Sequence, residues 1–392
     1  MIIILYLMNK LFEFIFMRNL VCIIGLLITL DLVAAPSIIP APPTIDASSY
    51  LVMDYTSGAI IVENNTDERL PPASLTKIMT IYVVASELKE GGLRLEDEVL
   101  VSEKAWRTQG SRMFIEVGKR VTVDNLLNGV IIQSGNDASV ALAEHVSGTE
   151  DVFADLMNKH AEKLGMTNTH FTNSTGLPDD NHYTTAKDLA ILSRAYISNF
   201  PEIYSRNSIK EFKFNNIKQK NRNKLLWRDS SVDGIKTGHT DAAGYCLVAS
   251  AVRDDMRLIS VVMGASGTNA RTKASQALLN YTYRFYESHQ LYGTNEVVIT
   301  VPIWKAEQKE IKLGTNEQII LTIPRGQYEK LEPAVDIPID IIAPVKQGDK
   351  FGTLNIQLND KVLATVPLIA LENIDEGGFF TRMKDKVRLL IK

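Results

Sequence analysis

Residues 233–264 read DGIKTGHTDAAGYCLVASAVRDDMRLISVVMG. Runs of small and β-branched apolar residues, interrupted by polar turns such as 253–255, predict consecutive antiparallel strands. Far upstream, YLVMD (50–54) and AIIVE (59–63) flank a short polar turn and predict a β-hairpin. Because strands stand at both ends of a mostly helical stretch, we predict an α+β domain whose first hairpin joins the later strands in one sheet.

The stretch between these strands carries the end signals of helices. A Pro-Pro pair at 71–72 precedes an apolar pattern that ends at Gly91 and Gly92. Further along, Thr185 and Asp188 form a capping box. The helices expected on this basis run from about residue 74 to 89, from 149 to 165, from 185 onward and from 272 to 289.

Two further segments follow this first domain. Residues 296–372 hold short β-rich runs punctuated by Pro and Gly, which predicts a small all-β domain. Residues 375–392 predict an amphipathic helix with five basic residues and one acid from residue 379 onward. Such a helix suits an anionic membrane surface. Docking of the helix on its own domain is the alternative.

Composition limits the function. A chain of 392 residues has room for two or three domains, and 45% hydrophobic with 22% charged residues is ordinary for globular proteins. Lys and Arg number 42 against 46 Asp and Glu, so we expect no nucleic-acid partner. Two cysteines and six histidines without an H-E-x-x-H motif predict no disulfide scaffold, no metal and no other cofactor.

Residues 1–35 predict a secretory signal, because a basic residue precedes an apolar run that ends in small residues. We expect cleavage after Ala35, which would remove Cys22. A translation start at Met8 or Met17, or an uncleaved anchor, stays open. The protein is therefore expected outside the cytoplasm.

Ser74 and Lys77 form an S-x-x-K motif at the start of the first expected helix. Residues three apart share a helix face, so the lysine amine can reach the serine hydroxyl. Serine is a weak nucleophile until a base removes its proton, and a lysine with a lowered pKa can do so. The helix start also offers backbone N–H groups to a developing oxyanion. Alone, Ser74 reads equally well as a helix cap.

Two other tripeptides carry compatible chemistry. Ser134-Gly135-Asn136 can relay a proton and bind a carbonyl, although alone it reads better as a helix cap. Lys236-Thr237-Gly238 can form one wall of a cleft, where the lysine binds a carboxylate and the glycine lets substrate approach. The order S-x-x-K, S-x-N, K-T-G, with gaps of 57 and 102 residues, makes the combination far more specific than any part.

With these three motifs the chain resembles the D-alanyl-D-alanine carboxypeptidases, the low-molecular-mass penicillin-binding proteins of the 5/6 type. The similar stretches are PPASLTKIMT (71–80), QSGNDASVALAE (133–144), NRNKLLW (221–227), TIPRG (322–326) and EGGFF (376–380). The resemblance implies a serine β-lactamase/transpeptidase-like domain over 44–291, with an antiparallel sheet flanked by helices. It also implies a small β-sandwich over 296–372 and a membrane-anchoring helix over 375–392.

The same resemblance assigns roles. Ser74 would attack the bond between the two terminal D-alanines of peptidoglycan pentapeptides, with Lys77 as general base and Ser134 and Asn136 in the proton network. Lys236, Thr237 and Gly238 would hold the substrate carboxylate, assisted by Arg222 and, more weakly, by Arg271. The backbone N–H groups of Ser74 and His239 would form the oxyanion hole. β-Lactams would acylate Ser74, and the enzyme would lie in the periplasm, on the outer face of the inner membrane.

Other functions are less compatible with the residues. A class A-like β-lactamase needs a glutamate that activates water, yet no Glu lies between Met166 and Thr185. A catalytically idle scaffold would be expected to have lost Ser74, Lys77 or Lys236. A DD-endopeptidase of the same family keeps all three motifs and stays open as an alternative.

Overall fold

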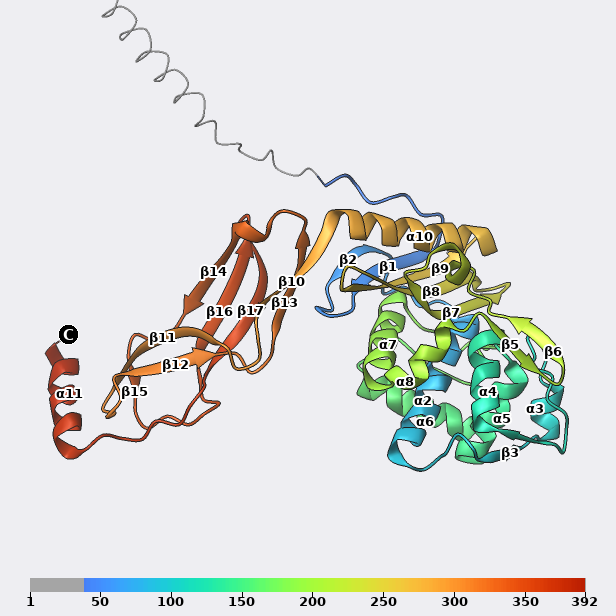
Figure 1. Cartoon of the computed structure of the whole chain (residues 1–392), viewed down its shortest axis with the longest axis horizontal. Coiled ribbons are helices and arrows are strands. Elements are labelled where there is room, and N and C mark those ends of the chain that lie inside the picture. The colour runs from blue at the N-terminus through green and yellow to red at the C-terminus, as the bar shows by residue number, and fades with distance from the viewer. Residues whose placement is uncertain (1–38, 392) are drawn as a thin grey trace, which may run out of the picture. The chain divides into compact units, whose positions relative to one another are not determined.

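The computed structural model describes residues 39–391 and has an α+β domain followed by a β-rich domain (Figure 1). The α+β domain contains a five-stranded antiparallel sheet in the order β2-β1-β9-β8-β7. Its strands are β1 (Ser49–Asp54), β2 (Ile60–Asn64), β7 (Val232–Thr240), β8 (Gly244–Arg253) and β9 (Met256–Ala265). β1 lies beside β9, with Val52 opposite Ser260, which confirms that the first hairpin joins the later strands.

Helices cover both faces of this sheet (Figure 1). One face carries α10 (Thr268–Phe285), and the other carries a helical region that includes α2 (Lys77–Glu90) and α7 (Ala186–Asn199). The other helices of this region are α3 (Glu103–Arg107), α4 (Val123–Asn128), η2 (Gly129–Gln133), α5 (Asn136–Ser147), α6 (Glu150–Lys163), α8 (Pro201–Tyr204), η3 (Ser205–Ser208) and α9 (Leu225–Arg228). Short hairpins are formed by β3 (Glu98–Leu100) with β4 (Arg120–Thr122) and by β5 (Glu211–Phe214) with β6 (Ile217–Lys220).

α2 is the central helix of this region. Every residue from Lys77 to Ser86 is buried, because neighbouring helices and the sheet surround it. The expected helix from about residue 74 is present, but its first residues form a 3-10 turn, η1 (Ala73–Thr76), and the α-helix begins at Lys77. Lys77, the first residue of α2, therefore lies in the core.

The end of α10 differs from the expectation. The sequence predicts a helix over 272–289, whereas α10 ends at Phe285 and β10 (Tyr286–Tyr292) follows. β10 pairs with β13 (Ile319–Pro324), so that His289 faces Leu321. The polar residues of β10 carry no strand signal of their own, and the distant partner decides their conformation.

The second domain is β-rich. Its other strands are β11 (Val297–Trp304), β12 (Glu310–Gly314), β14 (Leu331–Asp336), β15 (Ile341–Ile342), β16 (Lys350–Leu358) and β17 (Lys361–Ala370), and η4 (Tyr328–Lys330) precedes β14. Six strands form one sheet in the order β14-β16-β17-β12-β11-β15, while β10 and β13 form a second. Side chains of both sheets, among them Leu313, Ile323 and Ile356, share one hydrophobic core.

The chain ends in α11 (Phe379–Ile391), which leaves large apolar side chains in solvent. Phe380 is 86% exposed and Leu390 is 79% exposed. Within residues 39–391, no helix is long and apolar enough to cross a membrane. The expected signal over residues 1–35, including Cys22, lies outside the described residues.

Candidate active site

Ser74 lies in the 3-10 turn η1, half-buried, directly before α2. The Lys77 amine donates to the Ser74 hydroxyl at 3.1 Å, as the S-x-x-K spacing predicts. Lys77 is fully buried and also donates to Asn136 Oδ1 at 2.7 Å and to the Thr175 carbonyl at 2.6 Å. Asn136 and Thr175 are thus two fixed acceptors that hold the lysine nitrogen beside the serine.

The charge state of Lys77 is set by its surroundings. Burial, and secondarily the nearby Arg222 guanidinium, lower the pKa of Lys77 to about 7, whereas Asp137 and Glu150 act in the opposite direction. A neutral amine is therefore accessible near pH 7, and a neutral amine can accept the Ser74 proton.

Ser134 and Lys236 meet across the site from separate elements. Lys236 Nζ, on β7, donates to Ser134 Oγ at 2.8 Å. Ser134 ends η2 with a φ of 64°, a left-handed conformation that few non-glycine residues adopt, and such strain is concentrated at functional sites. Burial and the charges of Lys77, Arg222 and Arg271 lower the pKa of Lys236 well below its ordinary value.

Asn136 and its neighbour Asp137 hold the start of α5 against residues 109–114. Asn136 Nδ2 donates to the Gln109 carbonyl at 2.6 Å, while its Oδ1 holds Lys77. The buried Asp137 carboxylate accepts from the backbone N–H groups of Met113 and Phe114, each at 2.9 Å. Asp137 was not among the expected site residues, although its place directly after the S-x-N motif is a signal for it.

β7 presents the K-T-G motif to the nucleophile. Thr237 and Gly238 are buried, and a Cβ on Gly238 would lie 2.9 Å from the Pro72 carbonyl, close to Ser74. This close approach explains the glycine. His239 is exposed, and its ring lies against Tyr245 with 4.0 Å between the centroids, so the ring faces a neighbouring strand residue.

The two arginines differ in their surroundings. Arg271 is buried and donates to the carbonyls of Gly238 and Cys246 at 2.8 and 3.1 Å, so it joins β7 to β8. Arg222 is exposed, and its Nε donates to the Gln133 carbonyl at 2.9 Å. Arg222 is therefore the better placed of the two to meet a substrate carboxylate. Cys246 is a free, buried strand residue, as expected.

A group of basic side chains surrounds an open cavity beside Arg222, and we call it the cationic rim. Its members are Lys220, Arg222, Lys224, Arg228 and Arg271, and the exposed Trp227 lies with them. Within residues 39–391, none of the five forms an ion pair with a carboxylate. The positive potential of the cationic rim therefore favours the binding of anionic groups.

His182 is a second buried group that the sequence analysis missed. The Nε2 atom of His182 lies 2.8 Å from the Oγ1 of Thr76, a residue that stands between Ser74 and Lys77 in the chain. The Nδ1 atom of His182 accepts from the Thr172 N–H at 3.1 Å. Burial lowers the pKa of His182 to about 4. The neutral ring thus links η1 to Thr172, three residues before the Thr175 carbonyl that contacts Lys77. In the described part of the chain, no cluster of three His, Cys, Asp or Glu side chains could hold a metal.

A serine hydroxyl in contact with a buried lysine, between an antiparallel sheet and a helical region, is the arrangement typical of serine hydrolases that work through an acyl-enzyme. The chain belongs to the D-alanyl-D-alanine carboxypeptidase family of serine peptidases, whose pattern it matches over residues 37–267. Residues 286–376 match the C-terminal domain of penicillin-binding protein 5. The expected family and fold class are therefore confirmed.

Individual relatives agree with this assignment. The chain is 46% identical over 355 residues to the D-alanyl-D-alanine carboxypeptidase DacC of Escherichia coli, covering 88% of this chain and 89% of the relative. Penicillin-binding protein 5 from Haemophilus influenzae has a similar structure, with a TM-score of 0.83 and 40% sequence identity. The match covers 86% of this chain and 100% of that structure. An ampicillin-bound penicillin-binding protein D2 from Listeria monocytogenes matches with a TM-score of 0.57 and 30% sequence identity. This match covers 62% of this chain and 99% of that structure.

Proposed function

We propose that Ser74 is the nucleophile that removes the terminal D-alanine from peptidoglycan pentapeptides. The observation that carries this proposal is the contact between Lys77 Nζ and Ser74 Oγ at 3.1 Å, made by an amine whose pKa is lowered to about 7 by burial. A base at this distance, neutral at the working pH, is what a serine nucleophile requires.

The reaction follows from the contacts. Neutral Lys77 accepts the Ser74 proton while Ser74 Oγ bonds to the carbonyl carbon of the penultimate D-alanine. The backbone N–H groups of Ser74 and His239 stabilise the oxyanion. The C–N bond then breaks: Ser134, held by Lys236 at 2.8 Å, gives its hydroxyl proton to the departing amine of D-alanine and takes in exchange the proton that Lys77 received from Ser74. Lys77, neutral again, accepts a proton from water as the water oxygen bonds to the ester carbonyl carbon. Lys77 returns this proton to Ser74 Oγ when the ester C–O bond breaks and the shortened peptide leaves.

The substrate's free carboxylate selects the orientation. Lys236 and Thr237 on β7 bind it, and Arg222 adds a further positive charge at the mouth of the site. A β-lactam carries a carboxylate and a reactive amide, so it acylates Ser74 in the same orientation. The Glu150 carboxylate is no substitute for a β-lactamase water-activating glutamate, because its oxygens are held by Ser174 and Lys104.

The remaining segments fit a wall enzyme held at a membrane. Residues 1–35 would direct export to the periplasm, and residues 375–392 would bind the anionic outer face of the inner membrane. The exposed apolar side chains of α11, next to its basic residues, support this attachment. The β-rich domain would act as the spacer between membrane and catalytic domain.

Intact mass spectrometry of the mature protein after mixing with benzylpenicillin tests the proposal, with Ser74→Ala as the control. We expect a one-to-one adduct that persists for minutes in the wild type and is absent in the variant, together with D-alanine release from a pentapeptide by the wild type alone. Consumption of penicillin without an adduct would indicate a β-lactamase, and an adduct that survives in Ser74→Ala would remove Ser74 from its role.

A further inference from the structure

An irregular segment, residues 172–177, supplies the carbonyl that holds Lys77. Two successive carbonyls of the segment face α2: that of Ser174 accepts from Thr80 Oγ1 at 2.7 Å, and that of Thr175 accepts from Lys77 Nζ at 2.6 Å. Because Lys77 and Thr80 are one helix turn apart, the segment lies along α2 beside the base. The position of the Thr175 carbonyl therefore contributes directly to the position of the Lys77 amine.

This segment also abuts the nucleophile. Gly176 has a φ of +81°, and a Cβ at that position would lie 1.8 Å from the Ala73 carbonyl, in the residue before Ser74. Asn173 Oδ1 accepts from the N–H groups of Thr175 and Gly176 at 3.1 and 2.8 Å. A displacement of the segment would thus reach both Ser74 and Lys77.

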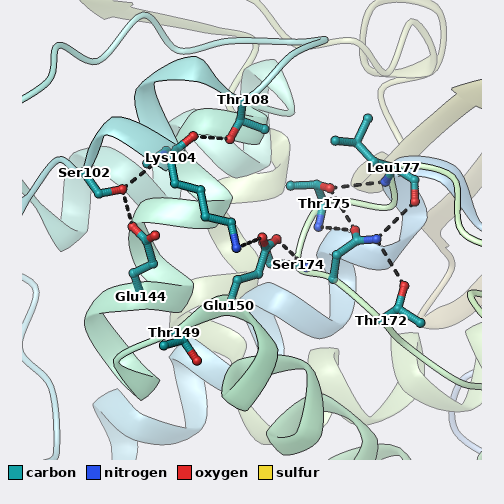
Figure 2. A network of polar contacts seen from close by, with 12 residues as sticks. Ser102, Lys104, Thr108, Glu144, Thr149, Glu150, Thr172, Ser174, Thr175 and Leu177 are labelled. Carbon is teal, nitrogen blue, oxygen red and sulfur yellow. Dashed lines mark hydrogen bonds and ion pairs between the residues drawn. The ribbon is translucent and has the colours of Figure 1, made fainter.

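Residues 172–177 form neither helix nor strand, so side chains hold them in place (Figure 2). Glu150 Oε1 accepts from the Ser174 N–H at 3.1 Å and from Ser174 Oγ at 2.7 Å. Glu150 Oε2 lies 2.9 Å from Lys104 Nζ, on α3. This one carboxylate therefore connects α3, the start of α6 and the segment that carries Thr175.

Glu150 is ionised where it lies. Burial would raise the pKa of Glu150, but the hydrogen bonds from Lys104 and Ser174 hold that pKa below its ordinary value. Glu150 is also the first residue of α6, where the helix dipole favours a negative charge. A buried carboxylate with fixed donors on both oxygens is rigid as well as charged.

We propose that Glu150 is a positioning residue for the general base: it fixes residues 172–177 so that the Thr175 carbonyl holds Lys77 Nζ against Ser74 Oγ, and its charge favours the protonated lysine. Lys104 serves as the counter-ion that keeps Glu150 in place. The inference rests on the proposed role of Lys77.

The charge of Glu150 shifts the pKa of Lys77 in a defined direction. The charged groups that act on Lys77 are Arg222, before α9; Lys236, on β7; Asp137, on α5; and Glu150, on α6; the imidazole of His182 also lies within electrostatic range. Asp137 and Glu150 raise the pKa of Lys77, against burial and Arg222. Neutralising Glu150 removes one of the two stabilising charges, so the pKa of Lys77 falls and the base is neutral at lower pH.

Three variants of the full mature chain separate charge from geometry. Glu150→Gln keeps an oxygen that can accept from Ser174 but removes the charge. Glu150→Ala removes both. Glu144→Gln is the matched control, because Glu144 lies on the other side of Lys104 and accepts from Ser102 Oγ at 2.5 Å instead of from Ser174 (Figure 2). The readout is the second-order rate constant for acylation by benzylpenicillin from pH 5 to 9, with thermal unfolding as the check on folding.

For Glu150→Gln we expect the acidic limb of the pH profile to move to lower pH while the plateau rate stays near that of the wild type. For Glu150→Ala we expect a plateau about 10- to 100-fold lower, since a 1 Å displacement of a catalytic group can cost about 100-fold. Glu144→Gln should retain the wild-type profile.

The inference is overturned if the acidic limb of Glu150→Gln coincides with the wild type, or if folded Glu150→Ala acylates at the wild-type rate. If Glu150→Ala fails to fold, the limb of Glu150→Gln alone decides. A wild-type protein that is not acylated at all would contradict the proposed function itself, which keeps the two failures distinguishable.

Discussion

Lys236 Nζ donates to Ser134 Oγ at 2.8 Å although the two residues are 102 positions apart. The contact joins the sheet to the helical region, since Lys236 lies on β7 and Ser134 lies between η2 and α5. Lys77 makes the equivalent contact to Ser74 within one helix turn. Each of the two serine hydroxyls thus contacts its own buried lysine.

Ser134→Ala removes the hydroxyl through which the proton reaches the departing amine. We expect kcat for D-alanine release to fall about 100-fold or more, the usual contribution of a proton-transfer group, with a much smaller change in KM. Steady-state kinetics on a pentapeptide measure both values. Ser139→Ala is the matched control, because Ser139 is a buried serine on α5 whose Oγ donates to the Gly135 carbonyl. Equal losses in both variants would assign the effect to packing.

The lowered pKa of Lys77 predicts the acidic side of the pH profile. Because the neutral amine is the base, and its pKa is about 7, the acylation rate should fall about tenfold for each pH unit below that value. Rapid-mixing measurements with benzylpenicillin from pH 5 to 9 give the limb. Lys77→Arg stays charged over this range and should show no acylation at any of these pH values. A wild-type rate that is flat from pH 5 to 7 would contradict Lys77 as the base.

His182 predicts a loss of stability in mild acid. Its pKa is lowered to about 4 by burial, against 6.5 unperturbed, so the unfolded chain takes up this proton first. The contribution is complete above pH 6.5 and is lost as pH falls toward 4, by up to about 3 kcal/mol. Urea unfolding at several pH values should therefore show a shallower pH dependence for His182→Gln than for the wild type. His145→Gln, at an exposed position on α5, should keep the wild-type slope.

The cationic rim predicts a salt-dependent reaction with the anionic substrate. The kcat/KM for a pentapeptide should decrease as ionic strength rises, because salt screens the attraction between the rim and the substrate carboxylate. A variant with Lys220, Lys224 and Arg228 all changed to Gln should show a kcat/KM about two- to tenfold lower at low salt and a weaker salt dependence. Lys218→Gln is the control, since Lys218 is already paired with Glu211 at 2.5 Å. A triple variant with the full salt slope would exclude steering by the rim.

The tail predicts reversible membrane attachment. Deleting residues 375–392 removes the exposed Phe380, Leu390 and Ile391 together with the basic residues, so binding to anionic vesicles should be lost while penicillin acylation is retained. Co-sedimentation with phosphatidylglycerol-containing vesicles measures the binding, and neutral vesicles should bind the intact protein more weakly. Sedimentation of the truncated protein with the vesicles would place the attachment elsewhere.

Elements whose signals are local were predictable from the residues alone. Strand-like runs bounded by polar turns predicted β1, β2, β7, β8 and β9. Thr185 caps α7 as expected, with the Asp188 N–H donating to Thr185 Oγ1 at 3.1 Å, but the Asp188 carboxylate accepts from the Asn168 N–H and so does not complete the capping box. The contact of Ser74 with Lys77 was equally predictable, because spacing within one turn fixes it. The three motifs and their order were enough to predict the family.

Features that depend on distant partners arise in the folded chain and have no local signal. β10 is a strand because β13 lies beside it, and the sequence of β10 alone suggested helix. The lowered pKa of Lys77 depends on the burial of residues 77–86 of α2, to which several helices contribute. Glu150 and Thr175 belong to the site because the chain folds residues 172–177 against α2, and no local pattern encodes that contact. Burial and long-range pairing are properties of the packed chain, so they appear only when it is folded.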